Sequence, residues 1–209
     1  MNFIAIYIIC KYRYVDKTQI AIGILFGALC MPSNFAMGLS AILPYISAMA
    51  IFKNTTNQIA LYQTKKSHTL IRTIILIFIV GGILGGINVF FAVGSMTINP
   101  SLHIKWITDA LRAGIFEEIF FRFFFFALCV YITKDKPLAK MENALCYAIM
   151  VIPHVLIHFN FQTFSVGNLI MLSLLFGFPF AWIQRKYNLV SAIGSHAFVD
   201  FIRFCTFGL

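Results

Sequence analysis

Residues 114–126 read GIFEEIFFRFFFF. This stretch places two adjacent acids, Glu117 and Glu118, and one base, Arg122, in the middle of a run of phenylalanines. A carboxylate at the depth of a bilayer is costly, and it is rare there unless it has a function. The stretch therefore predicts a membrane-crossing helix that carries the functional site.

The composition of the whole chain agrees with a membrane location. The 209 residues are 60% hydrophobic and 11% charged, with a mean hydropathy of +0.88. A soluble domain carries about 25% charged residues. The net charge of +9 does not indicate a nucleic-acid partner, because positive charge in a polytopic protein is usually loop charge. The chain is therefore predicted to be an integral membrane protein with the lipid bilayer as its surroundings.

Apolar segments alternate with short basic loops, which predicts an all-α polytopic fold with seven or eight transmembrane helices. The number depends on whether the short first segment spans the membrane. A turn-like sequence at Met31–Asn34 indicates a helical hairpin, and one long kinked helix is the alternative. The segments are 2–10, 19–33, 37–52, 71–94, 106–133, 142–161, 166–183 and 188–208.

The loop charges give an orientation when the loops are assigned alternately to the two sides of the membrane. One side receives eleven basic residues and the other receives only Lys105. By the positive-inside rule the basic side is cytoplasmic. The eleven are Lys11, Arg13, Lys17, Lys53, Lys65, Lys66, Lys134, Lys136, Lys140, Arg185 and Lys186.

The 106–133 segment offers an ion pair and a second carboxylate. Glu118 and Arg122 lie four residues apart on one helix face and can pair. Glu117 lies about 100° away round the helix, outside that pair. Such a carboxylate in a low-dielectric setting suits a general base acting on water. A purely structural ion-pair cluster between helices is the alternative.

Two later segments carry further ionisable pairs at the same spacing. His154 and His158 lie on one face of the 142–161 segment, and His196 and Asp200 lie on one face of the last segment. A single pair of this kind is easily structural. Three helices with such pairs favour one shared polar intramembrane cavity.

Two other patterns indicate packing. The phenylalanines around Arg122 are interpreted as a lipid-facing and packing surface. Four glycines in the 71–94 segment allow close contact with another helix. They are Gly81, Gly82, Gly85 and Gly86.

The three motifs resemble those of the CAAX protease and bacteriocin-processing family (CPBP, also called Abi), whose members are intramembrane endopeptidases. Glu117, Glu118 and Arg122 match its Glu-Glu-x-x-x-Arg motif, and His196 with Asp200 matches its His-x-x-x-Asp/Asn motif. The middle motif is usually Phe-x-x-x-His; here the final histidine is His158, and His154 replaces the phenylalanine. The resemblance covers residues 105–209 as a catalytic helical core, and residues 1–104 carry no recognised motif.

The resemblance implies a role for each matched residue. Glu117 would activate a water, His158 would help to hold it, and His196 with Asp200 would stabilise the oxyanion. Glu118 and Arg122 would order the site, and His154 would be an additional donor, an additional ligand or a cavity-wall residue. Zinc held by Glu117, His158 and His196 is the alternative to a metal-free glutamate mechanism. The substrate would be a membrane-associated peptide or protein.

Two other functions also place ionisable residues inside membrane helices. A proton-coupled transporter subunit would more often show repeated halves, whereas the ionisable residues here lie in the C-terminal half. A non-catalytic immunity or partner-binding protein would carry the motifs without cleaving. The short chain and its Phe, Ile and Lys usage favour a bacterial cytoplasmic membrane.

Overall fold

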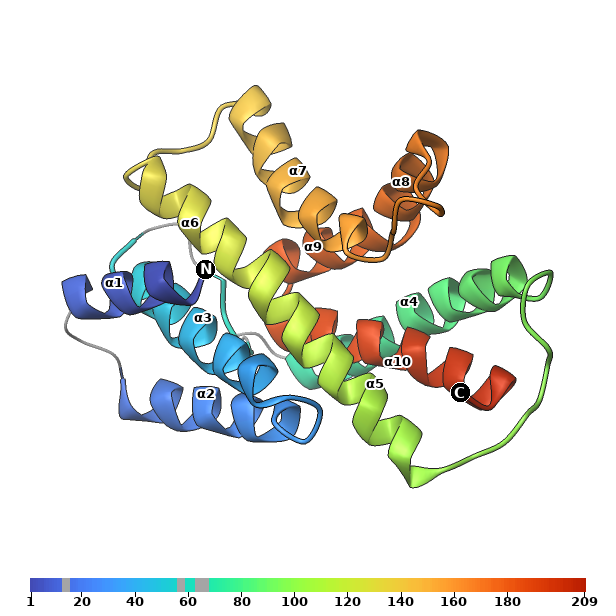
Figure 1. Ribbon diagram of the computed structural model, residues 1–209. Coiled ribbons are helices and arrows are strands. Elements are labelled where there is room, and N and C mark those ends of the chain that lie inside the picture. The colour runs from blue at the N-terminus through green and yellow to red at the C-terminus, as the bar shows by residue number, and fades with distance from the viewer. Residues whose placement is uncertain (13–15, 56–58, 63–67) are drawn as a thin grey trace. The chain divides into compact units, whose positions relative to one another are not determined.

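The computed structural model describes residues 1–12, 16–55, 59–62 and 68–209. All regular structure in these ranges is helical (Figure 1). Three of the basic loop residues, Arg13, Lys65 and Lys66, lie outside the described part. The chain divides into two compact units, each made of two stretches of sequence. The first unit is Met1–Ile59 with Phe116–Trp182, and the second is Ala60–Ile115 with Ile183–Leu209.

The first unit begins with three helices, of which α1 (Asn2–Tyr12) and α2 (Lys17–Cys30) both pack on α3 (Phe35–Lys53). The hairpin predicted at residues 31–34 is confirmed. The side chain of Asn34 accepts a hydrogen bond from the backbone N–H of Ala36 at 2.8 Å and so starts α3. Figure 1 shows α3 running alongside α2 in blue.

The rest of the first unit contains the motif-bearing helix and two partners. A continuous helical stretch runs through α5 (Ile104–Glu117), the π-helix η1 (Glu118–Phe123) and α6 (Phe124–Ile132). Its residues up to Ile115 belong to the second unit, and those from Phe116 belong to the first. The stretch is followed by α7 (Lys140–Leu156) and by α8 (Val166–Leu172), the π-helix η2 (Ser173–Gly177) and α9 (Phe178–Lys186). Of these, α6 and α7 pack on η1 and on each other.

The second unit is built on α4 (Thr69–Ala92) and α10 (Leu189–Phe207), which pack in parallel. Gly81 and Gly85 face α10, as the glycine pattern predicted. A Cβ atom on Gly81 would lie 2.9 Å from the carbonyl oxygen of Ser195, and one on Gly85 would overlap Ile202. Gly82 lies farther from α10, and Gly86 has open space around it.

All eight predicted apolar segments are helical in the described residues. Four of these helices are long and apolar enough to cross a membrane: α3, α4, the α8–η2–α9 stretch and α10. The helices α1 and α2 are apolar but shorter. The fold is therefore that of an all-α integral membrane protein. The number of seven or eight spans stays a prediction.

The 142–161 segment ends earlier than predicted, because α7 stops at Leu156. The amide of His158 bonds to the carbonyl of Val155, a shorter step than an α-helix makes. The side-chain oxygen of Asn160 then accepts from the amides of Gln162 and Thr163. This local bonding of an asparagine to its own backbone competes with the helix and turns the chain.

Candidate active site

The first motif lies at a change of helix type. Between Glu118 and Phe123 the backbone forms a π-helix, in which the amide of Phe124 bonds to the carbonyl of Ile119, five residues back. Short π-helical turns inside α-helices occur often at functional sites. The sequence predicts one regular helix here and gives no sign of this turn.

The predicted pair of Glu118 and Arg122 forms. Arg122 Nη1 donates to Glu118 Oε1, and both side chains are 0% exposed. The guanidinium carbon of Arg122 also lies 5.4 Å from the centre of the Phe180 ring, which covers it from α9. The pair is therefore a buried, oriented ion pair and not a surface contact.

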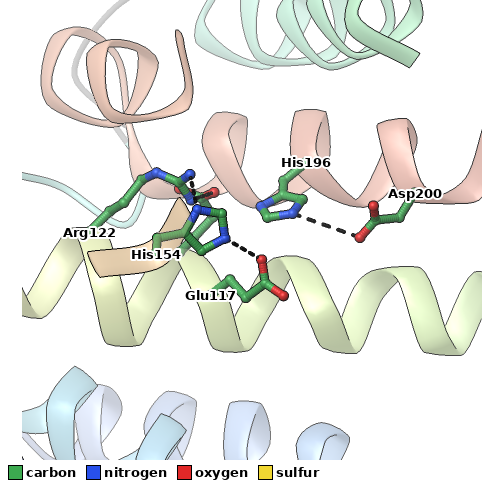
Figure 2. A network of polar contacts seen from close by, with 6 residues as sticks. Glu117, Arg122, His154, His196 and Asp200 are labelled. Carbon is green, nitrogen blue, oxygen red and sulfur yellow. Dashed lines mark hydrogen bonds and ion pairs between the residues drawn. The ribbon is translucent and has the colours of Figure 1, made fainter. Parts of the chain in front are cut away.

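His154, on the last turn of α7, joins this pair to the other glutamate (Figure 2). Its Nδ1 lies 3.0 Å from Arg122 Nη2, and its Nε2 lies 2.5 Å from Glu117 Oε2. A guanidinium can only donate, so Nδ1 must be the acceptor. The hydrogen of the neutral imidazole is then on Nε2, which donates to Glu117.

The two glutamates differ in their access to solvent. The side chain of Glu117 is 15% exposed, whereas that of Glu118 is fully buried against Arg122. Of the two adjacent carboxylates, only Glu117 therefore keeps accessible surface.

His158, the matched histidine of the middle motif, lies outside the helix. It is exposed, in the turn after α7, and its ring centre lies 5.1 Å from that of His154. The helix ends before it for the reason given above. The buried histidine that contacts Glu117 is thus His154, at the position where the family pattern usually has phenylalanine.

The third motif lies in the second unit, on α10. His196 is buried, and its Nε2 lies 3.7 Å from Asp200 Oδ2, as dashed in Figure 2. The two side chains share a face, as their spacing predicted. The separation is longer than a direct hydrogen bond, so the carboxylate acts on the imidazole through its charge.

The phenylalanines around Arg122 are mostly packed inside the protein, which confirms the packing part of the predicted lipid-facing and packing surface. Phe121, Phe123, Phe124 and Phe126 are buried. Phe123 stacks on Tyr45 of α3 with ring centres 5.8 Å apart. A lipid-facing run and a packed run have the same composition, so the sequence alone does not separate them.

The structure thus joins four predicted residues in the first unit into one chain of contacts, Glu118–Arg122–His154–Glu117. His158 lies beside this chain, and His196 with Asp200 forms a pair in the second unit. Phe180, which covers Arg122, was not predicted, since it lies almost sixty residues away in sequence and belongs to no motif.

Comparison with known proteins gives one match. Residues 99–202, close to half of the chain, match the family described as type II CAAX prenyl endopeptidase Rce1-like. The matched region contains all three motifs, and it agrees with the resemblance inferred from them. No curated protein and no solved structure matches the chain.

Proposed function

Because residues 99–202 belong to the Rce1-like family of CAAX prenyl endopeptidases, we propose that this chain hydrolyses a peptide bond in a membrane-associated peptide or protein by means of a water activated by Glu117. The observation that carries the proposal is the buried chain Glu118–Arg122–His154–Glu117. It fixes the orientation of the one carboxylate of the network that keeps accessible surface.

In the proposed reaction Glu117 takes a proton from a water while the water oxygen bonds to the substrate carbonyl carbon. The carbonyl oxygen becomes negative, and a donor is needed to stabilise it. We assign this role to His196 together with Asp200. The proton held by Glu117 then passes to the amide nitrogen, and the carbon–nitrogen bond breaks.

His154 and Arg122 act through Glu117 in this scheme. Arg122 donates to His154 Nδ1, which keeps the hydrogen on Nε2 and directs it at Glu117 Oε2. Glu118 in turn orients Arg122. His158, which lies beside His154, is assigned to holding the water or the substrate at the exposed edge of this network.

His154 does not fit a zinc ligand. Nε2 would need a lone pair to bind zinc, and the hydrogen would move to Nδ1, facing the N–H of Arg122 3.0 Å away. No step is therefore assigned to a metal. The zinc set predicted from the sequence, Glu117, His158 and His196, is left to a chelation experiment.

The membrane assignment follows the loop charges. We propose seven or eight spans, with the basic loops on the cytoplasmic side of a bacterial membrane. Peptide substrates anchored in or on that membrane would reach Glu117 by lateral diffusion. The family name points to prenylated proteins, and the proposal extends to any membrane-associated peptide.

The test is cleavage of membrane-anchored peptides by the full chain reconstituted in lipid vesicles, with products identified by mass spectrometry. Glu117→Gln should lower the rate about a hundredfold or more, which is the usual contribution of a general base. Glu142→Gln is the matched control, because Glu142 is an exposed glutamate that only caps α7 through the amide of Ala139.

The outcomes distinguish the proposed base, the metal-free and zinc mechanisms, and the alternative functions. Cleavage that persists in Glu117→Gln rejects Glu117 as the base. Loss of cleavage on chelation, with recovery on added zinc, rejects the metal-free mechanism. Proton flux through the vesicles without cleavage of any peptide supports a transporter, and stable peptide binding without cleavage supports a partner-binding protein.

A further inference from the structure

A second polar region lies in the second unit, where α4 begins and where α9 is linked to α10. It is a cavity of about 640 Å³ lined by residues of both segments. Its polar lining includes Arg72 and Lys186, together with His68. None of these residues takes part in the proposed hydrolysis.

The cavity is positively charged. Arg72 and Lys186 are both exposed, and no carboxylate is present among the residues that line it, all of which are described. The N-terminus of α4 opens at the same place and adds the positive end of a helix dipole. His68 at this N-terminus makes no side-chain cap hydrogen bond. The cavity is therefore suited to an anionic group such as a phosphate.

The wall of the cavity is held in place by buried polar contacts. Asn188 Nδ2 donates to Thr73 Oγ1 at 3.2 Å, and Asn188 Oδ1 accepts from the amide of Ser191 at 2.7 Å. These bonds tie the start of α10 to the first turns of α4. The basic side chains thus project from a rigid base.

An apolar ridge continues from the cavity along α4. Ile71 and Ile75 line the cavity, and both are exposed. Ile79 and Ile83 follow at the same four-residue interval and are also exposed, so the four isoleucines lie on one helix face. This face belongs to one of the helices long and apolar enough to cross the membrane.

We propose that this cavity binds the headgroup of an anionic phospholipid, whose acyl chain lies along the ridge of Ile71, Ile75, Ile79 and Ile83. A basic pocket at the end of a membrane helix attracts anionic headgroups. A free phosphate would share the basic contacts but would gain nothing from the ridge. The basic cavity and the apolar ridge together therefore favour a phospholipid over a free phosphate.

The experiment measures lipid binding to the purified, delipidated full chain by native mass spectrometry and by thermal unfolding. Phosphatidylglycerol is compared with phosphatidylcholine of the same acyl chains and with inorganic phosphate. Phosphatidylglycerol should bind more tightly than phosphatidylcholine and stabilise the chain more. Arg72→Ala and Lys186→Ala should each weaken phosphatidylglycerol binding about fivefold, the effect of one cation near an anionic membrane surface.

Two variants serve as controls, and a third tests the contribution of the isoleucine ridge. Arg72→Lys keeps the charge and should bind within about twofold of the unchanged chain. Lys17→Ala removes an exposed lysine at the start of α2 and should have no effect. Ile79→Ser should weaken phosphatidylglycerol binding and leave any phosphate binding unchanged.

Equal binding of the two phospholipids would overturn the proposal. So would full competition by inorganic phosphate, which would assign the cavity to a free anion. If Arg72→Ala does not fold, Lys186→Ala and Arg72→Lys still decide between the outcomes.

Discussion

Removal of the Arg122 guanidinium tests the physical basis of the candidate active site. Arg122→Met keeps a long apolar stem but leaves Glu118 as a carboxylate with no exposed surface. Breaking a buried ion pair by removing one partner typically costs about 3–5 kcal/mol, because the remaining charge is uncompensated. We expect a loss of that size in the free energy of unfolding.

The double variant Glu118→Leu/Arg122→Met separates charge from packing. It removes both charges, so the large penalty for an isolated carboxylate disappears. Nδ1 of His154 still loses the donor that lies 3.0 Å away, and an unsatisfied buried acceptor costs about 1–3 kcal/mol. The double variant should therefore be more stable than Arg122→Met and less stable than the unchanged chain.

The assay is a reversible unfolding titration in mixed micelles, followed by tryptophan fluorescence or circular dichroism. Arg112→Met is the matched control. Arg112 pairs with Asp109 at 3.0 Å, but both side chains are more than 20% exposed, and such pairs contribute about 1 kcal/mol or less. If Arg122→Met costs no more than Arg112→Met, or if the double variant is as unstable as the single one, the reasoning from burial is wrong.

Three further predictions concern single contacts. His154→Phe restores the residue usual in the family pattern but removes the donor to Glu117 at 2.5 Å, so peptide cleavage should fall at least tenfold while the chain still unfolds cooperatively. Gly81→Ala brings a Cβ to 2.9 Å from a backbone oxygen of α10 and should cost about 1–3 kcal/mol by overpacking, whereas Gly86→Ala, in open space, should cost nothing in the same unfolding assay. Lys11 donates to the hydroxyl of Tyr131 at 2.7 Å, which raises the pKa of Lys11; Tyr131→Phe should return that pKa toward its ordinary value in an NMR titration. Since the pKa is raised in the folded chain, the stabilisation is present at neutral pH and is lost as the pH rises through it.

Much of the fold followed from the sequence because membrane helices are long, apolar and separated by loops of different character. The eight segments appear as helices, and the turn at residues 31–34 is where the chain reverses. Contacts within one helix could be predicted from the sequence equally well. A spacing of four residues places two side chains on one helix face independently of the tertiary structure. This holds for Glu118 with Arg122 and for His196 with Asp200.

Contacts between helices could not be predicted from the sequence in this way. His154 and His158 lie four residues apart, and the sequence gives both the same face. Which of them is buried depends on where α7 ends, and α7 ends at Leu156, before the turn in which Asn160 bonds to its own backbone. The family pattern favoured His158, while the structure gives the contact with Glu117 to His154.

The charges of the network support the proposal that Glu117 is the reactive glutamate. Two carboxylates and one guanidinium leave one negative charge in excess when His154 is neutral, and Arg122 is committed to the fully buried Glu118. The excess charge therefore resides on Glu117, which accepts a hydrogen bond from the neutral N–H of His154. Protonating His154 would cancel that charge but would direct an N–H at the donor on Arg122. Under the proposed function, this remaining negative charge is the one that would accept a proton from water.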